Sequence, residues 1–154
     1  MIYLAGSCSS EHRTFMRKIA GKLRELGETV YCPFELKIEN AWDYSQEDWA
    51  KMVFDSDIKA LDEAETVIVI SPGRISSAGT NWEQGYSYAK GKRVYVFQIT
   101  EESTSLMTFC GCTSFRNTTE SELVENIRDY IKLGTDESSR SLAAVPGKCR
   151  TTLT

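Results

Sequence analysis

Residues 66–73 have the sequence TVIVISPG, in which five β-branched residues are followed by a serine, a proline and a glycine. β-Branched side chains favour an extended backbone, and a Pro-Gly pair favours a turn. A continuous apolar run of this length is typical of a strand that is covered on both faces, as in a parallel sheet. The run therefore predicts a central strand over residues 66–70.

Three further runs are short, apolar and bounded by turn residues. They lie at residues 1–5 before Gly6, at residues 93–97 after Gly91, and, more weakly, at residues 29–32 before Pro33. Each has the length of a strand and is too short for a stable helix. Together with residues 66–70, they predict a sheet of four strands.

Mostly apolar side chains recur at helical spacing between and after these runs, with Asp57 as the exception. The four groups are Phe15, Ile19, Leu23 and Leu26; Trp49, Val53, Asp57 and Leu61; Trp82, Tyr86 and Ala89; and Leu123, Ile127, Tyr130 and Ile131. Strands that alternate with helices predict an α/β fold, a doubly wound parallel sheet of the flavodoxin or Rossmann type flanked by helices. We expect one domain over residues 1–134 and a flexible C-terminal tail over residues 135–154.

The composition excludes several classes of protein. The 154 residues carry 18 basic and 22 acidic side chains, for a net charge of −4. A protein that binds nucleic acid through its phosphates has a basic surplus instead, so no nucleic acid partner is expected. The longest aliphatic run is residues 67–70, far below the roughly 20 residues of a membrane span, so no membrane association is expected. The N-terminus carries no basic leader, which predicts a cytoplasmic protein.

The cysteines and the histidine give no metal site. The five cysteines are an odd number, Cys110-Gly111-Cys112 is one residue shorter than a CxxC half-site, and His12 is the single histidine. Zinc sites and redox pairs use regular cysteine and histidine spacings. We therefore expect reduced thiols and neither a metal nor an organic cofactor. The three tryptophans, Trp42, Trp49 and Trp82, are expected in the core or at an interface.

Three loops follow the predicted strands and are rich in serine, threonine and glycine: residues 6–10, 71–80 and 100–105. In an open parallel sheet, ligands bind at the carboxyl ends of the strands. Hydroxyls and approachable backbone amides suit sugar or phosphate oxygens. Ordinary turns have the same composition, so each loop alone is open to both interpretations.

Glu83 lies in Gly79-Thr80-Asn81-Trp82-Glu83, and two interpretations are open. Thr80-x-x-Glu83 matches a capping box, with Thr80 as the N-cap of a helix and Glu83 returning to its amide. Alternatively, Gly79 lets a ligand approach the backbone closely, and Glu83 acts on a sugar as a carboxylate nucleophile.

Asp57 stands in an apolar row of its helix, between Val53 and Leu61. A buried carboxylate is costly, so Asp57 must be protonated, paired or facing a site. Burial raises the pKa of a carboxyl, which suits a proton donor. The alternative is that the helix frays near residues 55–57 and leaves Asp57 in solvent.

Four separated motifs resemble the nucleoside 2-deoxyribosyltransferase superfamily. They are Tyr3-Leu4-Ala5-Gly6, Asp57 ahead of an Ala-Glu-strand segment, Gly79-Thr80-x-x-Glu83-x-Gly85-x-x-x-Ala89, and Gly91-Lys92. The resemblance covers residues 1–133 and implies cleavage of the N-glycosidic bond of a nucleoside or nucleotide. It implies that Glu83 attacks C1′ of the sugar and that Tyr3 orients it. It also implies that Asp57 binds the substrate and helps to protonate the leaving base.

The serine pattern is most similar to that of the 2′-deoxynucleoside 5′-monophosphate N-hydrolases. Ser77 stands where the transferases carry an aspartate, Ser105 precedes Leu106-Met107 where they carry an asparagine, and Ser7 follows Gly6. In those hydrolases the three serines bind the 5′-phosphate, the third across a homodimer interface. They also carry an arginine soon after the first serine, where this chain has Cys8-Ser9-Ser10; Arg13 or Arg74 are the possible substitutes.

These observations predict an N-glycosidase that hydrolyses nucleoside 5′-monophosphates and works as a homodimer with sites completed in trans. The expected catalytic residues are Glu83, Asp57 and Tyr3. The expected substrate-binding residues are Gly6, Ser7, Ser77, Gly79 and Ser105. A nucleoside 2-deoxyribosyltransferase that exchanges bases is the first alternative, and a non-catalytic nucleotide-sensing module is the second.

Overall fold

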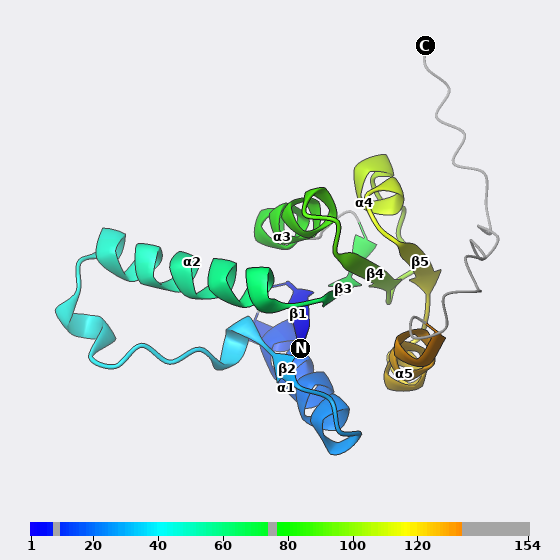
Figure 1. Ribbon diagram of the computed structural model, residues 1–154, viewed down its shortest axis with the longest axis horizontal. Coiled ribbons are helices and arrows are strands. Elements are labelled where there is room, and N and C mark those ends of the chain that lie inside the picture. The colour runs from blue at the N-terminus through cyan, green and yellow to red at the C-terminus, as the bar shows by residue number, and fades with distance from the viewer. Residues whose placement is uncertain (8–9, 74–76, 134–154) are drawn as a thin grey trace, which may run out of the picture.

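The computed structural model describes residues 1–7, 10–73 and 77–133 (Figure 1). Within these residues, five parallel strands form one sheet in the order β2-β1-β3-β4-β5. The strands are β1 (Ile2–Gly6), β2 (Val30–Tyr31), β3 (Thr66–Ser71), β4 (Arg93–Gln98) and β5 (Ser114–Asn117). The predicted doubly wound parallel sheet flanked by helices is confirmed.

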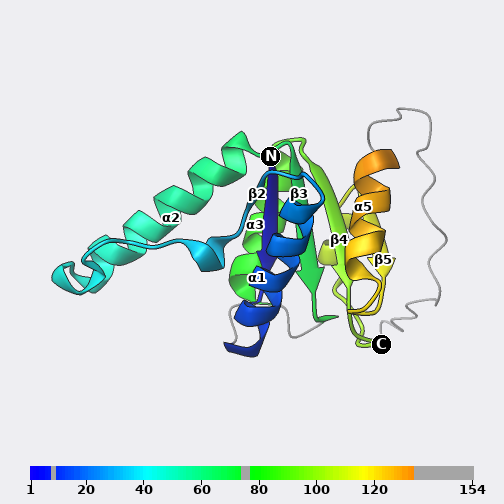
Figure 2. The ribbon, with the colours of Figure 1, turned by 90° about the horizontal axis from the view of Figure 1, so that it is seen from below.

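Helices cover both faces of this sheet (Figure 2). The α-helices are α1 (Ser10–Glu25), α2 (Gln46–Glu63), α3 (Ala78–Ala89), α4 (Leu106–Cys110) and α5 (Leu123–Leu133). Two short 3-10 turns, η1 (Pro33–Glu35) and η2 (Ala41–Asp43), lead from β2 into α2.

The alternation of side chains along β1 divides the core into two parts. Ile2 and Leu4 join a cluster with residues of α1 and α5, whereas Tyr3 and Ala5 join a cluster with the end of α2. The face of β1 that carries Tyr3 is therefore the face toward α2 and α3.

The elements missing from the sequence prediction are β5 and α4. β5 lies at the edge of the sheet, next to β4. Its residues Ser114, Arg116 and Asn117 are polar, with Phe115 as the apolar side chain. An edge strand does not need apolar residues on both faces, so it leaves no continuous apolar run to detect.

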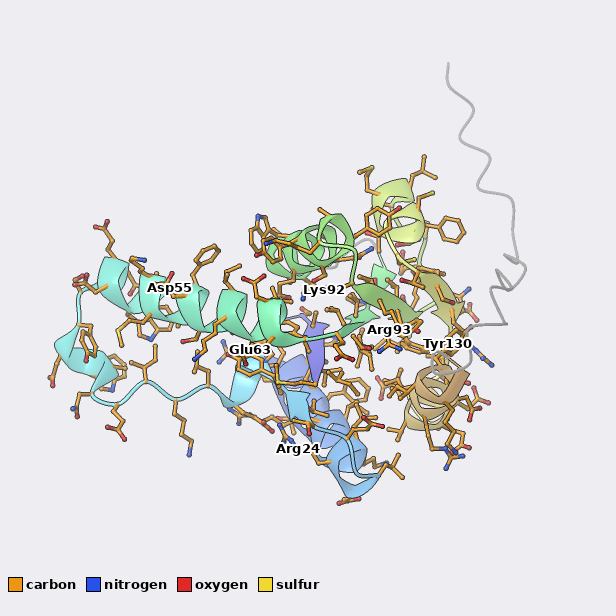
Figure 3. All side chains as sticks on the ribbon, viewed as in Figure 1. Arg24, Asp55, Glu63, Lys92, Arg93 and Tyr130 are labelled. Atoms are coloured by element: carbon orange, nitrogen blue, oxygen red, sulfur yellow. The ribbon has the colours of Figure 1, made fainter. Side chains whose placement is uncertain are left out.

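Helix α2 extends away from the sheet in both views (Figures 1 and 2). Ala60 and Leu61, in its last turn, are the buried residues of this helix. Lys92 holds the same end by donating to the carbonyls of Asp62 and Ala64, at 2.9 and 2.7 Å. Figure 3 shows Asp55 farther from the sheet than Glu63 on this helix.

The three tryptophans, expected in the core or at an interface, do not lie in the core. Trp42 is 99% exposed, and Trp49 and Trp82 are 38% and 48% exposed. Trp42 lies in η2 and Trp49 in the first turns of α2, where no sheet lies beneath them. The helical spacing of Trp49 was real, but it did not reveal how far the helix reaches beyond the core.

No helix in the described part of the chain is long and apolar enough to cross a membrane. The predicted tail over residues 135–154 lies outside the described residues, as do Cys8, Ser9 and Arg74.

Candidate active site

Glu83 is held by a tyrosine from the centre of the sheet. The hydroxyl of Tyr3 donates to Oε1 of Glu83 at 2.7 Å, across 80 residues of sequence. Tyr3 is fully buried in β1, and Glu83 is partly buried in α3. The bond therefore fixes one carboxyl oxygen from a rigid strand.

The N-cap of α3 is Ser77, so of the two interpretations left open, the capping box at Thr80 is wrong. The side chain of Ser77 accepts from the backbone amide of Thr80 at 3.2 Å. Thr80 lies in the first turn, where it already has a helical backbone, and its hydroxyl pairs with that of Ser77 at 2.6 Å. Because the helix starts before Thr80, the carboxyl of Glu83 is free of the capping role and faces Tyr3.

Asp57 has its own tyrosine partner. The hydroxyl of Tyr31, in β2, donates to Oδ1 of Asp57 at 2.8 Å. Helix α2 runs unbroken from Gln46 to Glu63, so the alternative that it frays near Asp57 is wrong. Asp57 was expected to be protonated, paired or facing a site, and the structure shows it paired with Tyr31.

Tyr31 was missed by the sequence analysis. Its signal was weak, because it was one tyrosine inside the short predicted strand over residues 29–32. β1 and β2 pair with Tyr3 opposite Tyr31, and the two rings stack with centroids 5.4 Å apart and planes 21° apart. Tyr3, Tyr31, Asp57 and Glu83 thus form one connected group, which we call the tyrosine–carboxylate cluster.

Burial perturbs the titration of both carboxyls. It raises the pKa of Glu83 to about 7, although the hydrogen bond from Tyr3 acts to lower it, and the charge of Asp57 raises it further. Burial also raises the pKa of Asp57, against the lowering effect of the Tyr31 hydroxyl. Two interacting carboxyls with raised pKa values can exist in different protonation states near neutral pH, which acid–base catalysis requires.

The raised pKa of Glu83 predicts a pH-dependent cost in stability. At pH 8 the group is ionised in both the folded and unfolded states, and burial penalises the charged form in the folded state. A rise from 4.5 to about 7 corresponds to about 3 kcal/mol at most. Glu83→Gln keeps an acceptor for Tyr3 and should raise the free energy of unfolding by this amount at pH 8.

Below pH 4.5 the carboxyl is neutral in both states, so the gain from Glu83→Gln should disappear as the pH falls through 7 toward 4. Urea denaturation at several pH values measures it. Glu63→Gln, which replaces an exposed glutamate in the last turn of α2, is the matched control. A gain that is the same at pH 4 and pH 8 would contradict the raised pKa.

The predicted substrate-binding serines lie at the ends of elements. Ser7 follows β1 directly and is partly buried. Ser105 caps α4 as Ser77 caps α3: its hydroxyl accepts from the amide of Thr108 at 3.1 Å and pairs with the Thr108 hydroxyl at 2.9 Å. The structure thus shows both serines as helix N-caps.

The two predicted glycines differ in their surroundings. A Cβ on Gly6 would lie 2.5 Å from Cε of Met16. The packing of α1 on β1 therefore leaves no room for a side chain at this position. A Cβ on Gly79 would meet no atom of the described residues within 4 Å, which leaves room on their side for an approaching molecule.

The second and third of the predicted loops are in contact. Gly73 has a φ of +81°, and a Cβ there would lie 2.6 Å from Cβ of Glu102 and 3.2 Å from the Thr100 hydroxyl. The contact brings the chain after β3 against the chain after β4. These loops therefore meet at one edge, as expected for the carboxyl ends of parallel strands.

A family model described as nucleoside 2-deoxyribosyltransferase matches residues 2–134. The chain belongs to the nucleoside 2-deoxyribosyltransferase family. Membership confirms the resemblance seen in the sequence. It also confirms the predicted class, an enzyme that is either an N-glycosidase or the related deoxyribosyltransferase.

Solved structures share the fold of this family member. The 2-deoxyribosyltransferase of the psychrotolerant bacterium Bacillus psychrosaccharolyticus is 27% identical over 80% of this chain and 89% of its own, with a TM-score of 0.63. A conserved protein from Enterococcus faecalis V583 is 20% identical over 84% of this chain and 97% of its own, with a TM-score of 0.68.

The CMP N-glycosidase BcmB of Clostridium botulinum is 21% identical over 84% of this chain and 98% of its own, with a TM-score of 0.59. At these identities, the Enterococcus and Clostridium structures show the fold alone. No curated protein matches the sequence.

Within the described residues, no three His, Cys, Asp or Glu side chains are grouped as metal ligands would be. Cys32, Cys110 and Cys112 are free thiols.

Proposed function

We propose that this family member hydrolyses the N-glycosidic bond of (deoxy)nucleoside 5′-monophosphates and releases the free base and (deoxy)ribose 5-phosphate. The observation that supports this most directly is the tyrosine–carboxylate cluster. Its two carboxyls come from different helices, each is held by a tyrosine, and burial raises both pKa values. Cleavage of a glycosidic bond with a nucleophile needs two carboxyls in different roles.

In the first step, Glu83 attacks C1′ as the carboxylate. Tyr3 holds Oε1 at 2.7 Å, which leaves the attack to Oε2. The new bond joins Oε2 to C1′, and the bond from C1′ to the base nitrogen breaks. Its electron pair goes to the base, which accepts a proton from Asp57 directly or through water. The buried carboxylate stabilises the positive charge that develops on C1′.

In the second step, water attacks C1′ and releases Glu83. The oxygen of water becomes the hydroxyl on C1′, and Asp57, now ionised, accepts the proton. A transferase differs in this step alone, because a second base replaces water as the attacking group.

Ser7, Ser77 and Ser105 are the proposed ligands of the 5′-phosphate. When Thr80 donates to Ser77 in the 2.6 Å contact between their hydroxyls, the Ser77 proton is free to bind a phosphate oxygen. Ser77 also stands at the N-terminus of α3, whose helix dipole favours an anion. Gly6 and Gly79 are proposed to leave room for the substrate beside these groups.

The first alternative is base exchange on unphosphorylated 2′-deoxynucleosides, which the 27% identity to a 2-deoxyribosyltransferase favours. Incubation with dCMP, dGMP and deoxyadenosine, each with and without a free acceptor base, separates the two functions. We expect free base from the monophosphates by chromatography. Base exchange on deoxyadenosine without hydrolysis of the monophosphates would identify a transferase, and inertness toward all substrates a nucleotide-sensing module.

The serine assignment predicts a selective loss of affinity. Ser77→Ala and Ser105→Ala should each raise KM for a monophosphate roughly 10- to 100-fold, since each removes a hydrogen bond to a charged group. Weak activity on the unphosphorylated nucleoside should stay almost unchanged. Ser45→Ala, which removes the cap of α2, is the control for the loss of an N-cap alone. Equal impairment of nucleoside and nucleotide would assign Ser77 to the sugar or the base instead.

Ser105 is proposed to act across a homodimer interface. It is the N-cap of α4, whose first residues Leu106 and Met107 are 60% and 82% exposed and offer an apolar contact to a second copy. If sites are completed in trans, mixing Glu83→Ala with Ser105→Ala protein should restore a low KM, because mixed dimers pair an intact Glu83 with an intact Ser105. A fully active monomer would contradict the shared site.

A further inference from the structure

Tyr31 occupies the place where the sheet meets the outer part of α2. It ends β2, the edge strand next to β1, and lies opposite Tyr3 in the parallel pairing. Residues opposite each other in a parallel pair point to the same face, so the Tyr31 ring lies on the face of α2 and α3. Its stacking on Tyr3, at 5.4 Å, follows from this register.

Asp57 lies where α2 leaves the sheet. The buried residues of this helix, Ala60 and Leu61, are one turn farther along. The turns before Asp57 extend away from the body of the molecule (Figures 1 and 2). The 2.8 Å bond from Tyr31 therefore anchors α2 to the sheet beyond its buried last turn.

From these contacts we infer that Tyr31 is a positioning residue for the proposed reaction. Its hydroxyl fixes the carboxyl of Asp57, and its ring fixes the ring of Tyr3. Because Tyr3 binds Glu83, Tyr31 also helps to fix the position of the Glu83 carboxyl. The inference rests on the proposed function, because it concerns how the proton donor and the nucleophile are held at one separation. Tyr31 itself need not touch the substrate.

Two helices carry the carboxyls, and two neighbouring strands carry the hydroxyls that hold them. α2 and α3 meet through side-chain contacts such as the bond from Tyr86 to Asp62, whereas Tyr3 and Tyr31 are joined by backbone pairing and by ring stacking. Without the Tyr31 hydroxyl, the carboxyl of Asp57 loses its fixed rotamer. A displacement of about 1 Å of a catalytic group can cost on the order of 100-fold in rate.

The Tyr31 hydroxyl also acts on the titration of Asp57. Tyr31 on β2 is the titratable group that acts on Asp57, and the charge of Asp57 in turn raises the pKa values of Tyr3 on β1 and Glu83 on α3. The hydrogen bond from Tyr31 lowers the pKa of Asp57 against the effect of burial. Its removal should therefore raise that pKa.

The test is Tyr31→Phe, which keeps the ring and removes the hydroxyl. We expect kcat for monophosphate hydrolysis to fall about 10- to 100-fold with KM nearly unchanged. Carbon NMR of protein labelled at aspartate, with the Asp57 signal identified from Asp57→Asn, should show its pKa rising. The matched control is Tyr86→Phe, because Tyr86 also donates to an aspartate of α2, Asp62, at 2.8 Å. That control should keep kcat.

A second variant, Tyr31→Leu, removes the stacking ring as well. It should lower kcat further than Tyr31→Phe and should also shift the pKa of Glu83. Equal rates for the two variants would overturn the role of the ring. Wild-type kcat together with an unchanged Asp57 titration in Tyr31→Phe would overturn the role of the hydroxyl.

Failure of the proposed function would give results that differ from failure of the role of Tyr31. If wild-type protein releases base from no monophosphate but exchanges bases on deoxyadenosine, the same variants are measured on that exchange. If it turns over neither, the reaction assignment fails while the titrations of Asp57 and Glu83 still decide whether Tyr31 holds the two carboxyls.

Discussion

Replacement of Glu83 by alanine or glutamine should abolish turnover and leave the fold intact. A nucleophile that forms a covalent bond to C1′ has no substitute in the cluster, so we expect a loss in kcat of about 10⁴-fold or more. The structure gives Glu83 no capping role, and its side chain is bonded to Tyr3. Glu83→Ala leaves that buried hydroxyl unpaired, at a cost of roughly 1–3 kcal/mol.

Single-turnover release of free base, followed by chromatography, measures the loss, and circular dichroism checks the fold. Glu83→Gln is the sharper variant, because it keeps the size of the side chain and an acceptor for Tyr3. Glu63→Gln is again the control, since this exposed glutamate lies on α2 outside the cluster. Near wild-type activity of Glu83→Gln would show that the carboxylate is not the nucleophile.

Asp57→Asn should lower kcat about 10²- to 10³-fold, the usual contribution of a general acid. The asparagine still accepts the hydrogen bond from Tyr31, so the position of the side chain is kept while the proton is lost. Since burial raises the pKa of Asp57, its ionised form destabilises the folded state, and the free energy of unfolding at pH 8 should rise.

The leaving group tests the role of Asp57 directly. A base that departs readily as an anion needs little protonation, so the loss in Asp57→Asn should be smaller for nucleotides with better leaving bases. An equal loss for good and poor leaving bases would indicate that Asp57 binds the substrate without protonating the base. An unchanged rate for all of them would exclude it from the reaction.

The strands of the sheet centre could be predicted from local sequence. Residues 67–70 and 94–97 are buried on both faces, so their side chains are apolar or aromatic at every position, and this leaves an unambiguous run. The same reasoning failed for β5, where an edge strand tolerates Ser114 and Arg116. It also failed for α4, five residues long and too short to show a helical period.

The site could be predicted in part. Asp57 was noticeable because a carboxylate stood in an apolar row, and the structure pairs it with Tyr31. Tyr31 could not be recognised from the sequence, because a tyrosine in a short strand has the same pattern as a core residue until the strand pairing is known. The two interpretations of Thr80-x-x-Glu83 also stayed open, because Ser77 offers the same kind of cap three residues earlier. In both places similar local patterns can be separated only by the contacts of the folded chain.

The outward reach of α2 has a thermodynamic consequence. Its apolar burial is concentrated at Ala60 and Leu61, so unwinding of its earlier turns exposes little apolar surface and requires far less free energy than unfolding of the sheet. Partial unwinding that reached Asp57 would withdraw one carboxyl from the cluster, while Tyr3 and Glu83 remained bonded in the body of the protein. The temperature at which catalysis is lost would then lie below the melting temperature of the fold.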